Sequence, residues 1–178
     1  MPQTDSIAER LRALIRDVPD FPRPGIVFKD ITPLLRDAAA LRASVSAMTE
    51  PYAAERVDVV AGIESRGFIL GAAIAFSLKA GFVAIRKQGR LPSKTILEEY
   101  SLEYGNAVLE IHADSVSAGQ RVLIVDDLLA TGGTARAATT LLRRLGGEVV
   151  ALSFLIELTF LKGADMIAGT PYSAVIKY

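Results

Sequence analysis

The middle of the chain alternates short apolar runs with segments of helical spacing, and this alternation limits the folds that the chain can adopt. In chain order these segments are 57–63 (apolar), 67–79 (helical), 82–86 (apolar), 121–125 (apolar), 134–145 (helical) and 149–156 (apolar). Short strands that are apolar along their whole length are typical of parallel sheets covered on both faces. The sequence therefore predicts an α/β fold with a mostly parallel, twisted sheet flanked by helices.

The N-terminal part of the chain lies outside this alternation. Ser6 and Glu9 have the spacing of a capping box, which predicts a helix whose apolar face extends to Ile15. The proline-rich residues 19–24 are expected to end that helix and to begin an extended connection. Asp37 is expected to cap a second helix.

A second interruption is the segment 87–119, which is polar and contains glycines, with short strand-like pieces such as 107–111. Long insertions in compact α/β domains are usually functional. We therefore expect this segment to form a lid or a hairpin.

Composition excludes several classes of protein. The 178 residues fit one domain, and 20 basic residues balance 20 acidic ones, so the chain lacks the charge of a general nucleic-acid binder. The absence of cysteine excludes disulfides and cysteine metal sites, and it fits a reducing cytoplasm. The charged N-terminus lacks the apolar block of a signal peptide, and no apolar stretch is long enough to span a membrane. We expect a cytoplasmic protein that binds neither nucleic acid nor membrane.

The segment with the clearest chemistry is Val122–Thr134, where an apolar strand leads through a loop of small residues into a helix. The strand ends in two carboxylates, Asp126 and Asp127, which suit the hydroxyl groups of a diol. The start of the helix offers free N–H groups to a phosphate, and the loop adds glycines and hydroxyls. The residues of this loop are Ala130, Thr131, Gly132, Gly133 and Thr134.

A phosphate site beside a diol site indicates ribose 5-phosphate as the ligand. No lysine follows the glycines, so the segment is not a nucleotide P-loop, and it lacks the dinucleotide-binding fingerprint.

Five segments resemble the type I phosphoribosyltransferase family, and specifically its adenine branch. In the order and spacing of the family, they are Phe21–Pro33, Gly62–Phe68, Ile85–Pro92, Tyr100–Gly105 and the central segment Val122–Thr134. The resemblance implies the type I fold as a single domain over 1–178, with residues 1–36 as a base-binding hood and 87–106 as a flexible lid. It also implies purine salvage, in which phosphoribosyl pyrophosphate donates its 5-phosphoribosyl group to N9 of adenine, giving AMP and pyrophosphate.

The resemblance assigns the sugar and phosphate contacts. The loop 130–134 would hold the 5-phosphate, and Asp126 and Asp127 would face the ribose hydroxyls. Ser65 and Arg66 would bind pyrophosphate, in a turn where the family often has a cis peptide, here expected between Glu64 and Ser65. The cluster of Arg86, Lys87 and Arg90 would absorb the charge of the leaving pyrophosphate. Arg90 stands where the family commonly has lysine, so the charge is kept but the hydrogen-bonding geometry differs.

The resemblance also assigns the base contacts. Glu103 would be the catalytic carboxyl group, hydrogen-bonded at N7 of the base, and Tyr104 would help the lid to exclude water. Relatives that act on 6-oxopurines carry an aspartate in the phosphate loop where this chain has Ala130. Adenine would lie near Val27, Phe28, Lys29 and Leu128, although Phe28 fits a place in the core equally well.

Magnesium is implied as a cofactor that binds together with phosphoribosyl pyrophosphate, and Asp126 and Asp127 act either on the ribose alone or on the metal through water. An arginine that corresponds to Arg86 reaches the neighbouring subunit in related enzymes, so the resemblance predicts a homodimer.

Two alternatives remain at this point. One is a neighbouring enzyme that acts on guanine, xanthine or orotate, and the segment Phe21–Pro33 would decide between these bases. The other is a regulator that senses phosphoribosyl pyrophosphate without catalysis. Such regulators carry a DNA-binding module, for which the chain has no room before Phe21.

Overall fold

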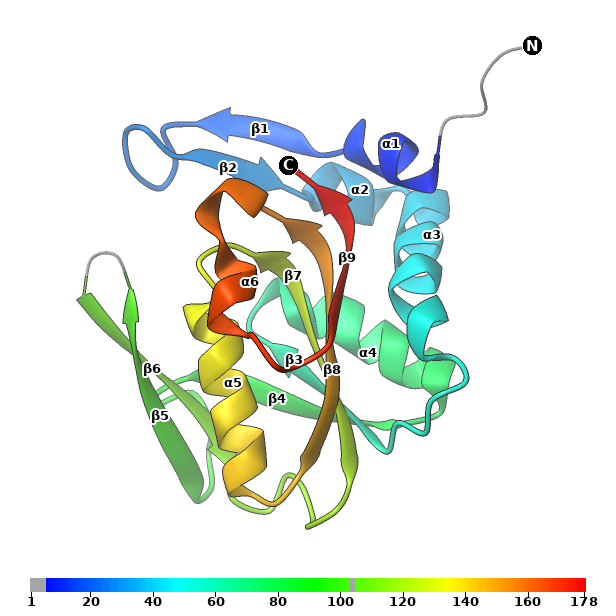
Figure 1. Cartoon of the computed structure of the whole chain (residues 1–178). Helices are drawn as coiled ribbons and strands as arrows, with labels where there is room; N and C mark the ends of the chain where they lie inside the picture. Colours follow the sequence, from blue (N-terminus) through cyan, green and yellow to red (C-terminus); the bar gives the residue numbers. More distant parts are fainter. Residues whose placement is uncertain (1–5, 103–104) are drawn as a thin grey trace.

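A computed structural model describes residues 6–102 and 105–178. Seven strands form one sheet in the order β5-β6-β4-β3-β7-β8-β9 (Figure 1). The five strands from β4 to β9 pair in parallel, whereas β6 pairs antiparallel with both β4 and β5. The predicted, mostly parallel α/β sheet is therefore confirmed. In sheet order, the strands are β5 (Thr95–Leu102), β6 (Gly105–His112), β4 (Gly81–Lys87), β3 (Val59–Ile63), β7 (Arg121–Leu129), β8 (Glu148–Glu157) and β9 (Tyr172–Lys177).

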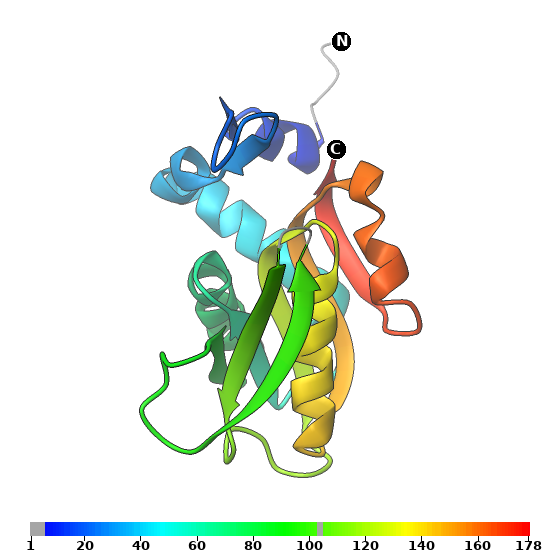
Figure 2. The ribbon, with the colours of Figure 1, turned by 90° about the vertical axis from the view of Figure 1, so that its left-hand side faces the viewer.

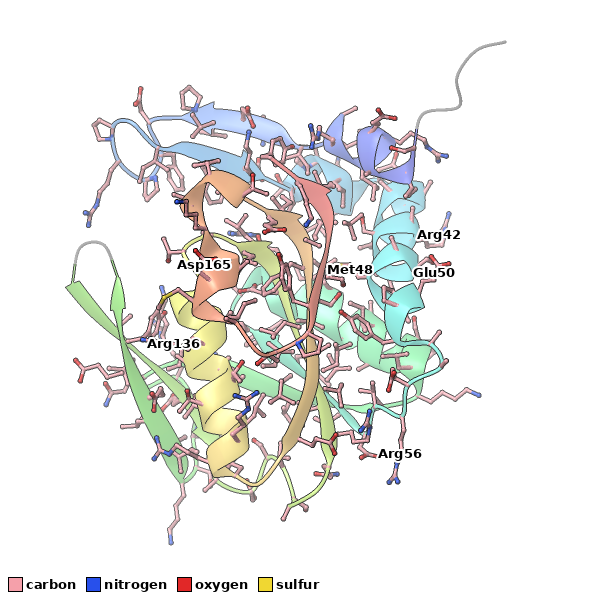
Figure 3. All side chains as sticks on the ribbon, viewed as in Figure 1. Arg42, Met48, Glu50, Arg56, Arg136 and Asp165 are labelled. Carbon is pink, nitrogen blue, oxygen red and sulfur yellow. The ribbon has the colours of Figure 1, made fainter. Side chains whose placement is uncertain are left out.

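Helices cover both faces of this sheet and create two apolar cores. On one face lie α1 (Ile7–Arg12), α2 (Thr32–Arg36), α3 (Ala38–Thr49) with the short 3-10 turn η1 (Glu50–Tyr52), and α4 (Arg66–Leu78). On the other lie α5 (Gly133–Arg144) and α6 (Gly163–Met166), which follows the 3-10 turn η2 (Thr159–Leu161). Figure 3 shows the two sides of α3 and η1: Met48 of α3 is fully buried, whereas Arg42 of α3 and Glu50 of η1 point away from the sheet.

The helix caps agree with the sequence. The capping box between Ser6 and Glu9 is present, and the Asp37 carboxylate accepts the N–H groups of Ala39 and Ala40 at the start of α3. The first helix, however, ends at Arg12 instead of extending to Ile15, because the chain there tightens into a turn and enters a strand.

The proline-rich connection is a hairpin, which the sequence did not predict. β1 (Arg16–Pro19) and β2 (Val27–Asp30) form a separate antiparallel sheet. Pro19 ends β1, whereas Pro22 and Pro24 lie in the turn, which contains a cis Phe21–Pro22 bond and a left-handed Gly25. Prolines are common in turns and rare in strands. Their presence therefore argued against strands on either side of the turn.

The polar insertion forms the predicted hairpin. β5 and β6 pair along their whole length, and β6 attaches the hairpin to the edge of β4. Figure 2 shows this hairpin standing beside α5. The Arg144 guanidinium of α5 donates to the Leu97 carbonyl of β5 at 2.7 Å, which ties the two together.

In the part of the chain that the structure describes, no helix combines the length and the apolar character needed to cross a membrane.

Candidate active site

The site lies where the connections of the main sheet diverge. After β3 the chain crosses through α4 to β4, and after β7 it crosses through α5 to β8 on the opposite side. Because β3 and β7 are adjacent and parallel, both helices begin at the same edge of the sheet. Neither N-cap residue, Ser65 or Gly132, accepts a hydrogen bond with its side chain, so both helix starts offer N–H groups to an anion.

The loop between β7 and α5 is built by close contact between backbones. Gly132 has a left-handed φ of 83°, and a Cβ atom there would collide with the Gly163 carbonyl. A Cβ at Gly163 would likewise collide with the Ala130 carbonyl, so residues at the start of α6 support the loop from behind. The loop and the end of β7 enclose a small hollow of about 70 Å³, lined by Asp126, Leu128, Leu129, Ala130, Thr131, Gly132, Thr134, Ala135 and Phe154.

The two aspartates differ in their surroundings. The Asp127 carboxylate is buried and accepts a hydrogen bond from Arg66 Nε at 2.5 Å. Asp126 Oδ1 accepts the Asp127 N–H at 2.8 Å, and a Cβ at Gly67 would lie 2.9 Å from the same oxygen. Burial, and then the neighbouring Asp127 charge, raise the pKa of Asp126 well above its usual value. The two adjacent carboxylates therefore have unlike partners, a backbone N–H for Asp126 and the Arg66 guanidinium for Asp127.

The predicted cis peptide between Glu64 and Ser65 is present. The Glu64 carboxylate accepts from Arg86 Nε at 2.9 Å, and Arg86 Nη1 donates to the Arg90 carbonyl at 3.0 Å. Of the three predicted cations, Lys87 lines the polar cavity described below, whereas the Arg86 guanidinium is turned toward Glu64 and the Arg90 carbonyl.

Seven of the predicted sugar and pyrophosphate residues line a polar cavity of about 370 Å³: Ser65, Arg66, Lys87, Asp126, Asp127, Ala130 and Thr134. Thr131 and Gly132 line the smaller hollow instead, and Gly133, Arg86 and Arg90 line neither. Tyr100 also lines it, and sequence reasoning missed this residue although it begins the matching block Tyr100–Gly105. Its hydroxyl accepts a hydrogen bond from Thr134 Oγ1 at 3.3 Å, so the hairpin touches the phosphate loop directly. The lining residues are Ile63, Glu64, Ser65, Arg66, Lys87, Tyr100, Leu109, Asp126, Asp127, Leu128, Ala130 and Thr134.

All four residues predicted to contact the base line a second, mainly apolar cavity of about 760 Å³. Phe28 is half-buried, and its ring lies 5.1 Å from the Arg66 guanidinium and 5.2 Å from the Phe21 ring. Lys29 Nζ lies 2.7 Å from Asp17 Oδ1 and 4.0 Å from the centre of the Tyr178 ring. The full lining is Asp17, Gly25, Ile26, Val27, Phe28, Lys29, Leu128, Ala130, Thr131, Leu158, Phe160, Leu161 and Tyr178.

Sequence reasoning missed the far wall of this cavity, which Leu158, Phe160, Leu161 and Tyr178 provide. These residues follow β8 or end the chain as given, and no local motif marks them. Leu128 and Ala130 line both cavities, so the polar and apolar cavities meet at the end of β7.

Glu103 and Tyr104, the predicted catalytic and lid residues, lie outside the described residues.

The donors at the polar cavity suit a metal that arrives with a phosphate ligand. Among residues 6–102 and 105–178, no group of three or more histidine, cysteine, aspartate or glutamate side chains could hold a metal ion. Asp126 and Asp127 nevertheless face the cavity from adjacent positions, and Mg²⁺ commonly binds through one or two carboxylates, water and substrate phosphates.

Comparisons with known proteins agree with this geometry. Residues 29–165 match the family described as phosphoribosyl transferase domain. An adenine phosphoribosyltransferase of Thermobifida fusca is 56% identical over 161 residues, which cover 90% of this chain and 92% of the relative. The crystal structure of an adenine phosphoribosyltransferase from Rhodothermus marinus superimposes with a TM-score of 0.94 at 51% identity, covering 97% of this chain and 98% of that one.

A more distant relative carries ligands. The adenine phosphoribosyltransferase of Saccharomyces cerevisiae, described as a complex with an imino-altritol bisphosphate and adenine, matches with a TM-score of 0.89 at 35% identity, covering 95% and 98% of the two chains. With the family match and these similarities along nearly its whole length, the chain belongs to the phosphoribosyltransferase family, and within it to the adenine phosphoribosyltransferases.

Proposed function

We propose that the chain catalyses purine salvage, transferring the 5-phosphoribosyl group of phosphoribosyl pyrophosphate to N9 of adenine. The observation that carries this proposal is the junction of two unlike cavities at the end of β7, one polar and flanked by two open helix starts, the other mainly apolar. A charged sugar phosphate suits the first cavity and a flat aromatic base suits the second, and the bond between them would form at Leu128 and Ala130.

Each end of the donor has a place in the polar cavity. The 5-phosphate would occupy the hollow formed by the loop 130–134, where the start of α5 supplies N–H donors. The ribose hydroxyls would bond Asp126 and Asp127. The pyrophosphate would lie at the start of α4, against Ser65, Arg66 and Lys87, with Arg86 and Arg90 close behind. Mg²⁺, when bound with the substrate, would neutralise charge that develops on the leaving pyrophosphate.

The reaction breaks the bond from ribose C1′ to pyrophosphate oxygen and forms a bond from C1′ to N9, so the ribose gains oxocarbenium character. The electrons of the broken bond leave with pyrophosphate, toward the cationic side of the cavity. Glu103 would hydrogen-bond N7, stabilise the charge that redistributes in the purine ring and, as a base, accept the ring proton that adenine loses when N9 bonds to C1′. Tyr104 and the hairpin β5–β6 would close over the centre and exclude water.

A homodimer in the cytoplasm is the form that we propose for the enzyme. Three large apolar side chains on α4 and β4 are exposed: Phe76 by 87%, Ile69 by 49% and Phe82 by 38%. Such a surface suits contact with a second copy, which would bring the region of Arg86 near the partner's site. Light scattering on the purified chain would test this, and a monomer at working concentrations would contradict it.

The test of the activity is product formation from phosphoribosyl pyrophosphate, Mg²⁺ and each of adenine, guanine, hypoxanthine, xanthine and orotate. AMP is expected as the dominant product. Turnover of another base would keep the sugar-phosphate site and overturn the assignment of the base cavity. Binding of phosphoribosyl pyrophosphate without any product would show a sensor instead of an enzyme.

The role of Glu103 has its own test. Glu103→Ala is expected to lower kcat by about 100-fold or more, the usual range for a general acid or base, with little change in the Kd for phosphoribosyl pyrophosphate. Glu98→Ala is the matched control from the same hairpin, because among the described residues the Glu98 carboxylate pairs with Arg144, at the base of the hairpin away from the cavity lining. Equal kcat values for the two variants would remove Glu103 from the mechanism.

A further inference from the structure

Glu110, near the C-terminal end of β6, is a carboxylate buried by a loop. The residue is only 3% exposed to solvent. Glu110 Oε1 accepts the N–H groups of Arg90 and Leu91, both at 2.7 Å, and Oε2 accepts the Thr95 hydroxyl at 3.3 Å. The carboxylate therefore holds the backbone of the loop that connects β4 to β5.

The sheet topology explains why the loop needs such a partner. β6 lies between β4 and β5, so the connection 88–94 must cross β6 to join them. Glu110 is paired with Arg86 of β4 on one side and with Leu97 of β5 on the other, so it sits beneath this crossing. A loop that crosses a sheet turns N–H groups toward it, and those groups require acceptors once water is excluded.

The hydrogen bonds keep this carboxylate charged. Burial on its own raises the pKa of Glu110, but the N–H groups of Arg90, Leu91 and Gly89 and the Thr95 hydroxyl outweigh it, and together they lower the pKa below the usual value. Charge-assisted hydrogen bonds are stronger than neutral ones, so the loop is held firmly at neutral pH.

The same loop adjoins the cations on the pyrophosphate side of the site. Lys87, which lines the polar cavity, ends β4 immediately before the loop. The Arg90 carbonyl, next to the N–H that Glu110 binds, accepts from Arg86 Nη1, and Arg86 in turn holds Glu64 of the cis turn. A displacement of the loop would therefore move one wall of the cavity.

We propose that Glu110 is a positioning residue, which fixes the loop 88–94 and thereby places the cationic groups that bind pyrophosphate. This inference rests on the function proposed above, because it takes the polar cavity to be the site of pyrophosphate. Glu110 itself touches no substrate: its effect passes through the backbone of residues 89–91.

The two ligands phosphoribosyl pyrophosphate and AMP separate this role from a general loss of structure, because only the first has a pyrophosphate group. Glu110→Ala is expected to weaken binding of phosphoribosyl pyrophosphate and of pyrophosphate by about tenfold or more, as for the loss of hydrogen bonds to a charged group. Binding of AMP, measured by the same calorimetry, should change by less than about twofold.

Asp58→Ala is the matched control. Asp58 also uses its carboxylate to hold a backbone N–H, that of Arg121 at 2.9 Å, but at the opposite end of the sheet. This control should lower the unfolding midpoint and leave both ligand affinities unchanged. Glu110→Gln, which keeps one acceptor oxygen, should give a smaller loss for phosphoribosyl pyrophosphate in the same direction, and it decides the matter if the alanine variant does not fold.

Equal weakening of AMP and phosphoribosyl pyrophosphate would overturn the proposal and leave Glu110 as a stabilising residue only. Unchanged affinity for both ligands in a folded variant would overturn it as well. If the wild-type chain binds phosphoribosyl pyrophosphate in the same experiment, only the role of Glu110 is overturned and the proposed function stands. A wild-type chain that binds neither ligand would overturn the proposed function and this inference together.

Discussion

The polar and apolar halves of the site are built in different ways. The polar half stands on the ends of β3, β4 and β7, strands that are hydrogen-bonded on both sides within the main sheet. Two ion pairs are already formed there: Arg66 holds Asp127, and Arg86 holds Glu64. The geometry of this half is therefore set before any ligand arrives, as electrostatic preorganisation requires.

The apolar half is assembled from segments that are distant in the chain. One wall is the separate sheet β1–β2, and the other is formed by residues after β8 and by Tyr178. Aromatic and cationic contacts join the walls, such as Lys29 over the Tyr178 ring. Changes in the polar half should therefore affect turnover and sugar-phosphate binding, whereas changes in the apolar half should affect binding of the base alone.

The largest effect is expected in the phosphate loop. Gly132→Ala combines an unfavourable left-handed φ with a collision against the Gly163 carbonyl, so the loop must shift. A displacement of about 1 Å at a reacting centre lowers the rate by about 100-fold, and we expect kcat/KM to fall at least that far. Gly119→Ala is the control, because Gly119 has a φ of 80° but an added Cβ meets nothing within 4 Å. Similar activities in the two variants would show that the backbone contact is unimportant.

The second effect concerns the acidic pair. Asp127→Asn removes the charge that faces Arg66 and one strong acceptor in the polar cavity. Phosphoribosyl pyrophosphate should bind about 10- to 100-fold more weakly, as for a hydrogen bond to a charged group, while the KM for adenine changes little. Calorimetry with the apoenzyme measures the first quantity. Unaltered binding would contradict the ribose contact.

The third effect tests the apolar half. Phe28→Ala removes a ring that lines the base cavity and lies beside the Arg66 guanidinium. The KM for adenine should rise about tenfold, from the apolar area and the aromatic contact that are lost. The Kd for phosphoribosyl pyrophosphate should stay as in the wild type. A change in both constants would mean that the two halves are not separable.

The smallest effect concerns the small sheet formed by β1 and β2. Asp30 accepts the hydroxyl of Thr32 at 2.7 Å and its N–H at 2.9 Å, and also pairs with Arg16; these contacts, led by the Thr32 hydroxyl, lower the pKa of Asp30 to about 2. Asp30→Ala should reduce the free energy of unfolding by about 1 kcal/mol at neutral pH. These contacts stabilise the ionised carboxylate in the folded protein. The difference in unfolding free energy between the wild type and the variant should therefore shrink as the pH falls from about 4 toward 2 and the carboxylate is protonated.

Urea unfolding of the wild type and the variant at neutral pH and at about pH 3 measures this difference. A difference that is independent of pH would contradict the ionic origin of the effect. A large rise in the KM for adenine would show that the position of the sheet β1–β2 depends on Asp30 more strongly than its contacts indicate.

The local sequence pattern predicted those elements whose burial is visible in consecutive residues. The apolar strands and the segment Val122–Thr134 were predicted correctly for this reason. A strand buried on both faces is apolar at consecutive positions, and a loop that begins a helix contains small and polar residues in a row. The far wall of the base cavity was not foreseen, because Phe160 and Tyr178 meet β2 only through the packing of distant segments.

Glu110 shows a second limit. In an alternating strand, a glutamate between Leu109 and Ile111 indicates a face turned to water. The structure buries it, because the connection 88–94 crosses that face. Burial here follows from the order of strands in the sheet, which the residues around Glu110 do not reveal.

The backbone contact between the phosphate loop and the start of α6 has a consequence for redesign. The backbones of Gly132 and Gly163 meet directly, with the Met166 Cβ beside them, so a new side chain at either glycine would collide with atoms that no change of rotamer can move. A longer loop, or a larger residue on either side, cannot be absorbed locally. Engineering of this loop for a different phosphate donor would have to vary residues 130–133 and 162–166 in one library, as a single unit of two segments.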